Sequence, residues 1–176
     1  MSQPPTIIPV PESIRQIANS SDRALAWHFF IFFARFEYAL KRDPRYLKAG
    51  IGDAEPDWDT FDSEHNSAFR PHSTPDLDAA VQYFLAEPPR KQLRKDSVMT
   101  WSDPQYHDGK EPLLIWLLRM VRRIRNNLFH GGKFPLIPIS DPSRDRDLLL
   151  KAMTILNAAL SLDSTVESQF AEGLNE

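Results

Sequence analysis

The chain has 176 residues, enough for one domain with a substantial core and too few for two of ordinary size. It contains no cysteine, which excludes disulfides and thiolate metal sites and makes a reducing compartment, by default the cytoplasm, the expected location. A formal net charge of −3 argues against a protein that coats nucleic acid through its overall field. We therefore expect a single cytoplasmic domain over residues 1–176.

The N-terminal region is expected to pass from an extended arm into a long helix. Residues 1–20 should form the arm, because four prolines fall within the first eleven positions. A first helix should begin by Asp22, where serine and aspartate residues offer suitable N-caps, and should run to about Arg42. The following Asp43-Pro44 pair then ends it, since proline cannot continue a helix.

This first helix has an unusually apolar composition. Large apolar side chains surround it rather than forming one stripe: Leu25, Trp27, Phe29, Phe30, Ile31, Phe32, Phe33, Phe36 and Tyr38. Such a helix is expected to be buried on most sides, either at the centre of the domain or at an interface. A membrane span is the competing explanation, but His28, Arg35 and Glu37 fall inside a stretch barely long enough to cross. We therefore expect no membrane association.

The middle of the chain combines an irregular segment with short elements. Residues 50–74 contain turn residues, aspartates and scattered aromatics without a sustained period, which predicts a long irregular insertion. A helix opened by a proline is expected from Leu77 to about Ala86. A short strand or hairpin is expected around residues 98–101.

Two further helices complete the expected architecture. One should start near Glu111-Pro112 and end before Gly131-Gly132. The other should run from about Ser143 to Leu162, leaving a marginal tail at 164–176. The predicted fold class is all-α: a small bundle of four main helices, with the irregular insertion between the first and the second.

The third of these helices carries a basic strip. The chain has no acidic residue between positions 112 and 140. Five cations fall there: Arg119, Arg122, Arg123, Arg125 and Lys133. The arginines interrupt an apolar run at helical spacing, so the strip is either a solvated helix face or a local site for nucleic acid.

The most informative motif lies at the end of this helix, where Arg125 and Asn126 are followed by His130 and two glycines. Gly131 suits the left-handed conformation that closes many helices, so His130 should lie in the last turn. The partial negative charge of the helix end there favours the imidazolium. An arginine with a polar residue after it and a histidine four to six positions on resembles the signature of the HEPN (higher eukaryotes and prokaryotes nucleotide-binding) family.

The resemblance implies a helical domain that usually dimerises. In the family's active branches it implies a metal-independent endoribonuclease, commonly a toxin or an antiviral effector. Residues 35–41 also look like the first-helix segment of some members, in which a glutamate, here Glu37, lies near the active site. Cleavage of this kind needs a base at the ribose 2′-hydroxyl and a cation at the phosphate oxygens, which His130 and Arg125 would supply.

The resemblance also implies the site residues and partners. Catalytic roles fall to Arg125, His130, Asn126 and Glu37, and RNA contacts to Arg119, Arg122, Arg123 and Lys133. No cofactor or metal is implied, and the implied partners are RNA, a second copy of the chain and, as a candidate, an antitoxin protein. The alternative is a catalytically silent HEPN module that binds a nucleotide or a protein partner such as a nucleotidyltransferase antitoxin.

Helical geometry constrains this motif. Arg125 and His130 are about 140° apart around an ideal helix, so their side chains diverge. We expect either unwinding at Gly131 or a cleft to which two subunits each bring both groups. Glu37 should lie within reach of Arg125 or His130, the alternative being an ion pair with Lys41 alone. The remaining histidines lack the paired short spacings of a metal site.

Overall fold

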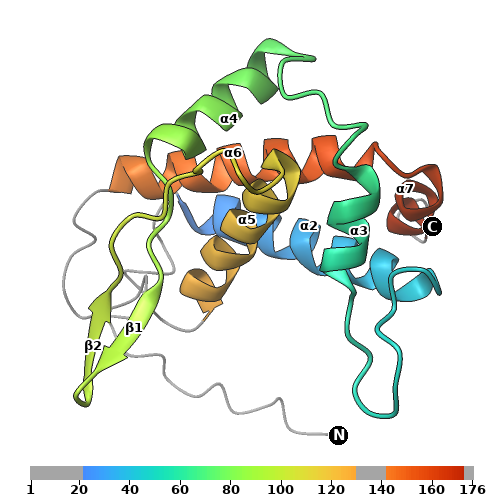
Figure 1. Ribbon diagram of the computed structural model, residues 1–176, viewed down its shortest axis with the longest axis horizontal. Coiled ribbons are helices and arrows are strands. Elements are labelled where there is room, and N and C mark those ends of the chain that lie inside the picture. Colours follow the sequence, from blue (N-terminus) through green and yellow to red (C-terminus); the bar gives the residue numbers. More distant parts are fainter. Residues whose placement is uncertain (1–21, 130–141, 173–176) are drawn as a thin grey trace, which may run out of the picture.

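The computed structural model describes residues 22–129 and 142–172 (Figure 1). The expected arm at 1–20, the expected unwinding at Gly131, and the candidates His130 and Lys133 lie outside the described residues. The described residues form six helices and a two-stranded antiparallel sheet. These are α2 (Asp22–Arg42), α3 (Trp58–His65), α4 (Pro75–Ala86), β1 (Gln92–Lys95), β2 (Val98–Trp101), α5 (Leu113–Phe129), α6 (Pro142–Leu160) and α7 (Ser164–Ala171).

Helix α6 lies at the centre of the bundle. It packs against α4, α2 and α5, while α7 contacts α2 and α3 contacts α5. Figure 1 shows α4 on one side of α6 and the pair α2 and α5 on the other. The mostly helical class is confirmed, but the described residues hold six helices and a hairpin rather than four main helices alone.

Helix α2 begins and ends where the sequence predicts. One stripe of it is buried in the core: Phe29, Phe33, Phe36, Ala39 and Leu40. The predicted burial of α2 on most sides is not observed within the chain, because the side chains of Trp27, Ile31 and Tyr38 are 58%, 41% and 41% exposed. Their spacing of four and seven residues places these three side chains on one face of the helix. Neither α2 nor any other helix in the described ranges has the length and hydrophobicity that crossing a membrane requires.

The segment 50–74, expected to be irregular, contains helix α3, so that expectation is wrong. Asp57 caps the helix, since its carboxylate accepts hydrogen bonds from the backbone N–H of Thr60 at 3.1 Å and from its hydroxyl at 2.9 Å. Trp58 stacks on Phe36 of α2 with ring centroids 5.2 Å apart. Eight residues are too few to show a sustained period, and packing against the bundle stabilises the helix instead.

The tail expected to be marginal after residue 164 forms helix α7, which corrects that prediction. Asp163 caps α7 by accepting hydrogen bonds from the backbone N–H groups of residues 165 and 166 at 2.9 and 3.1 Å. The same carboxylate accepts a hydrogen bond of 3.0 Å from the buried hydroxyl of Tyr46. The sequence of α7 alone favours a helix only weakly. Its N-cap, Asp163, belongs to a buried hydrogen-bond network, and this network stabilises the short helix.

Strands β1 and β2 form the hairpin that the sequence predicts around residues 98–101. Gln92 pairs with Trp101 and Lys95 with Val98. Asp96 and Ser97 make the two-residue turn and both have positive φ, at 48° and 68°, as a type I′ turn requires. Figure 1 shows the hairpin projecting away from the helices.

Candidate functional site

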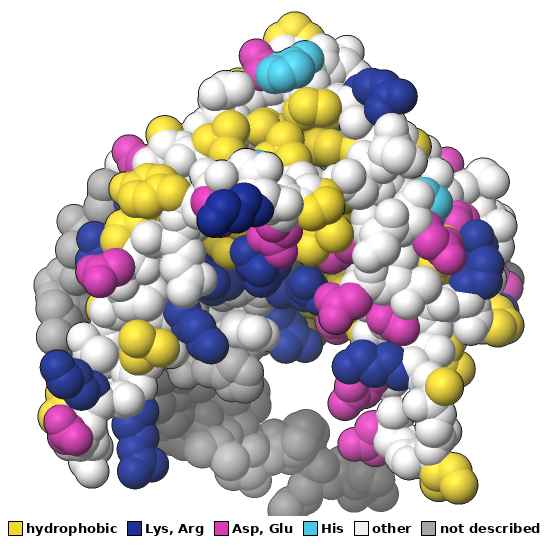
Figure 2. All heavy atoms as spheres, in the orientation of Figure 1, with side chains coloured by type: hydrophobic (Ala, Val, Ile, Leu, Met, Phe, Trp, Pro, Cys, Tyr) yellow, Lys and Arg dark blue, Asp and Glu magenta, His cyan; other side chains and the backbone are white. Residues whose placement is uncertain are grey.

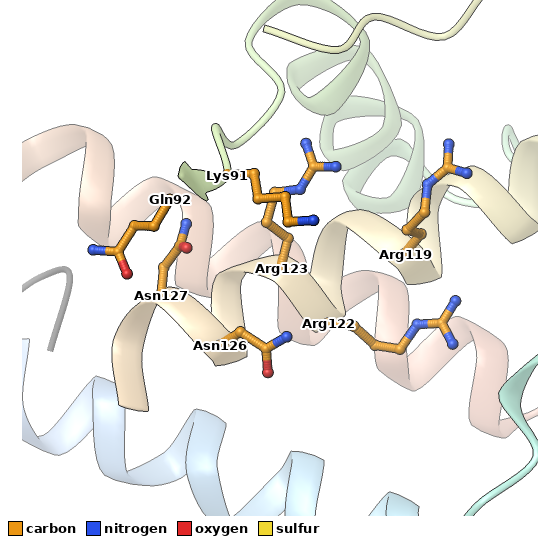
Figure 3. A pocket seen from close by; sticks show the side chains of 7 residues that line it. All are labelled: Lys91, Gln92, Arg119, Arg122, Arg123, Asn126 and Asn127. Carbon is orange, nitrogen blue, oxygen red and sulfur yellow. The ribbon is translucent and has the colours of Figure 1, made fainter. Parts of the chain in front are cut away.

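One side of α5 forms a wall of a surface hollow (Figure 3). Its core-facing side chains, Leu117 and Val121 among them, are fully buried. The hollow is lined from α5 by residues at helical spacing: Arg119, Arg122, Arg123, Asn126 and Asn127. Lys91 and Gln92, where the hairpin begins, complete the described lining of a space of about 440 Å³.

The hollow has a cationic and amide lining. Of the seven described lining side chains four are lysine or arginine, three are asparagine or glutamine, and none is acidic. Figure 2 shows dark blue Lys and Arg side chains gathered in the recess at the middle of this face. Guanidinium and ammonium groups with nearby amides are suited to an anionic ligand such as phosphate. The structure thus brings three of the predicted RNA-contacting arginines into one hollow.

Arg123 and Asn127 hold the hairpin against α5. The Nη1 of Arg123 donates to the carbonyl of Pro89 at 3.0 Å, and the buried amide of Asn127 donates to the carbonyl of Arg90 at 2.8 Å. Burial lowers the pKa of the Arg123 guanidinium, and neighbouring Arg119 lowers it further. These two residues therefore position the wall of the hollow as well as contributing charge and polarity to it.

The other two arginines of the hollow have carboxylate partners. Arg119 donates from both terminal nitrogens to the carboxylate of Glu111, with Nη1 to Oε1 at 2.8 Å. Arg122 lies between two aspartates of α3, with nitrogen to oxygen distances of 3.5 Å to Asp62 and 3.7 Å to Asp59. An anion that enters the hollow therefore meets two guanidinium groups whose orientation these acidic partners already fix.

Asp62 is a buried acid at the edge of this site. Its side chain is 0% exposed, and among the described residues neither carboxylate oxygen accepts a hydrogen bond. Burial raises the pKa of Asp62 to about 8, while Arg122 acts in the opposite direction. Near neutral pH the Asp62 carboxyl is therefore mostly protonated, which leaves the exposed Asp59, 3.7 Å away, as the described acid that compensates the positive charge of Arg122.

Arg125 lies on the α2 side of α5. Its Nη2 is 3.6 Å from Oε2 of Glu37, and its guanidinium lies over the ring of Phe33 at 5.4 Å from the centroid. Trp58 donates from Nε1 to the other oxygen of Glu37 at 3.3 Å. Glu37 therefore links α2, α3 and α5, and the prediction that it lies within salt-bridge reach of Arg125 is confirmed.

Asn126 connects the hollow with the Arg125–Glu37 pair. It is exposed and lines the hollow, and its Oδ1 accepts a hydrogen bond from Nη1 of Arg125 at 3.0 Å. Because His130 and Lys133 lie outside the described residues, the divergence of Arg125 and His130 stays a prediction. The structure brings together Arg125, Asn126 and Glu37 from the predicted catalytic set.

Sequence reasoning missed six residues that take part in this site: Trp58, Asp59, Asp62, Lys91, Gln92 and Asn127. A signal for α3 existed, because Asp57 is a good N-cap ahead of apolar residues three positions apart. The basic run 90–95 is a second usable signal. The sequence gives no signal for the burial of Asp62, since an aspartate in a polar segment ordinarily faces solvent.

Comparison with family models, with curated protein sequences and with solved structures finds no match for this chain. In the part of the chain that the structure describes, no three His, Asp or Glu side chains are grouped so that they could hold a metal ion. The features of the molecule that bear on function are the charge of the hollow and the motif around Arg125.

Proposed function

We propose that the chain is a metal-independent endoribonuclease of the HEPN type, a toxin or an antiviral or stress effector of the cytoplasm. The observation that carries this proposal is the hollow on α5, whose described lining is entirely cationic or amide-bearing. It adjoins the Arg125–Glu37 pair through Asn126. Phosphate contacts from lysine and arginine provide most of the sequence-independent affinity of proteins for nucleic acid.

The proposed reaction is an attack by the ribose 2′-oxygen on the neighbouring phosphorus. His130 takes the proton of the 2′-hydroxyl as the new bond forms, and the bond from phosphorus to the 5′-oxygen breaks. The leaving oxygen takes up a proton, which gives a 2′,3′-cyclic phosphate and a 5′-hydroxyl. Arg125 offsets the charge that builds on the phosphate oxygens, while Glu37 and Asn126 hold the guanidinium in place.

The residues of the hollow bind the flanking phosphates in this proposal. The described cations that line the space are Lys91, Arg119, Arg122 and Arg123, and Lys133 is assigned the same role from the sequence. A protonated Asp62 supports this assignment, because a neutral carboxyl does not offset the positive charge of Arg122.

We propose that the active form is a homodimer. The apolar stripe of α2 formed by Trp27, Ile31 and Tyr38 offers a surface that a second copy could cover. A cleft shared by two subunits would also reconcile the divergent directions expected for Arg125 and His130.

The second candidate function is a catalytically silent module that binds a nucleotide. The volume of about 440 Å³ falls within the range of small-molecule sites. Arg119 and Arg125 each lie against a glutamate carboxylate, so these two cations have an anionic partner without a polymeric ligand. This module could serve a protein partner such as a nucleotidyltransferase antitoxin.

Cleavage assays separate the two functions. Labelled RNA is incubated in excess chelator with the wild type, with Arg125→Ala and with His130→Ala. We expect each substitution to slow cleavage by about 10² to 10⁴. Arg70→Ala, which removes an exposed guanidinium between α3 and α4, should cleave at the wild-type rate and is the matched control.

Two outcomes would contradict the assignment. Undiminished cleavage by His130→Ala would mean that His130 is not the base. A wild type that binds nucleotides but cuts no RNA would overturn the ribonuclease and favour the silent module.

A further inference from the structure

The β1–β2 hairpin contributes little to the core. Every side chain in residues 93–101 is exposed. Four of them are large and apolar: Leu93, Val98, Met99 and Trp101. Met99 and Trp101 share one face of this short projecting element, and exposed apolar side chains gathered there indicate a binding surface.

The hairpin is also a basic part of an acidic chain. Residues 90–101 include Arg90, Lys91, Arg94 and Lys95, all exposed, against one acid, Asp96. In Figure 2 dark blue side chains lie on the projecting hairpin as well as in the central recess. A local excess of positive charge, set in a chain with a net charge of −3, fits a polyanion.

Strand pairing sorts the hairpin side chains onto two faces. Gln92 lies opposite Trp101 and Arg94 opposite Met99, so these four side chains share one face. The other face carries Leu93, Lys95, Val98 and Thr100. Gln92 also lines the hollow, and its buried Nε2 has no hydrogen-bond partner among the described residues. The face that carries Trp101 therefore continues from the hollow.

The direction of the hairpin is fixed at its base. Side chains of α5 donate to the carbonyls of Pro89 and Arg90 at 3.0 and 2.8 Å. The backbone N–H of Ser102 donates to the carbonyl of Lys91 at 2.8 Å, and the Lys91 N–H donates to the Ser102 hydroxyl at 3.0 Å. These bonds hold the strands together and orient them relative to the hollow.

We propose that this face of the hairpin binds single-stranded RNA beside the hollow. Trp101, which is 40% exposed, stacks on a base, Arg94 on the same face contacts the adjoining phosphate, and Lys91 contacts a further phosphate from the hollow. Aromatic stacking combined with a cationic path is how proteins bind single strands without reading their sequence. The inference rests on the proposed ribonuclease function and adds the surface that holds its substrate.

The test measures binding of a short fluorescein-labelled single-stranded RNA by anisotropy, with the full chain carrying His130→Ala so that the RNA stays intact. Trp101→Ala should weaken binding about 5- to 100-fold. Trp101→Phe should retain most of the affinity, because a ring is kept. Val98→Ala, on the same strand but the opposite face, should bind like the parent.

A second pair of variants tests the charge. Arg94→Ser and Lys95→Ser each remove one cation from neighbouring positions on opposite faces. Arg94→Ser should reduce the slope of log affinity against log salt by about 0.7, and Lys95→Ser should reduce it by clearly less, because Lys95 lies on the opposite face.

The outcomes separate this inference from the ribonuclease proposal. Equal affinity of Trp101→Ala and its parent, or equal weakening by Val98→Ala, would overturn the hairpin site while leaving cleavage intact. RNA binding that depends on Trp101, together with a wild type that cuts no RNA, would support the hairpin site and reject the ribonuclease. A chain that binds no RNA would overturn both.

Discussion

Replacing Asp62 with asparagine should remove most of the pH dependence of stability that this buried acid creates. The pKa of Asp62 is about 8 in the folded protein, against about 3.9 for an unperturbed aspartate. Between pH 4 and pH 8 the folded chain therefore holds a proton that the unfolded chain has released. The free energy of unfolding must fall as the pH rises through this window.

The magnitude follows from linkage. A difference of one bound proton changes the free energy of unfolding by about 1.4 kcal/mol per pH unit. From pH 5 to pH 7 the wild type should therefore lose about 3 kcal/mol through Asp62 alone. Asparagine does not titrate, so the free energy of unfolding of Asp62→Asn relative to the wild type should rise by the same amount across that interval.

Urea unfolding followed by tryptophan fluorescence at pH 5, 6 and 7 would measure this slope. Asp59→Asn is the control, because Asp59 faces the same Arg122 but its side chain is 90% exposed. The control should follow the pH dependence of the wild type. Equal slopes for the wild type and Asp62→Asn would refute the burial argument.

Three further predictions concern the core, the site and the assembly. Tyr46→Phe should lower the free energy of unfolding by about 1–3 kcal/mol in urea titrations, since it removes a buried hydroxyl bonded to Asp163. Tyr38→Phe, which alters an exposed side chain, should change the free energy of unfolding little. Glu37→Gln should slow RNA cleavage more than Lys41→Gln, because Glu37 contacts Arg125; equal rates would reduce Glu37 to a structural residue. Light scattering should show a dimer that Ile31→Glu dissociates, and a strictly monomeric wild type at tens of micromolar would exclude a shared cleft.

The long helices were predictable because local and periodic signals agree in them. α2 has capping residues before it, a proline after it and many apolar residues, and its predicted ends match the observed ones. α4 is preceded by Thr74, whose hydroxyl accepts from the N–H of Leu77 at 3.2 Å, as an N-cap before a proline predicts. The contact of Glu37 with Arg125 was expected because residues 35–41 resemble a HEPN first-helix segment that carries a glutamate near the active site.

The short helices α3 and α7 were harder to predict than the long helices, because tertiary contacts stabilise them. α3 depends on the stacking of Trp58 against α2, and α7 on a cap that is shared with Tyr46. Both contacts join residues distant in sequence, which periodicity cannot show. The same limit applies to the burial of Asp62 and to the hollow, which forms only where the hairpin base meets α5.

The most direct test of the proposed function is the chemical identity of the RNA ends that the purified protein produces in excess chelator. We expect a 2′,3′-cyclic phosphate and a 5′-hydroxyl, because the ribose oxygen rather than water attacks phosphorus. Both ends should disappear with Arg125→Ala. Products with a 5′-phosphate and a 3′-hydroxyl, or cleavage that stops when metal is removed, would contradict the proposed metal-independent reaction.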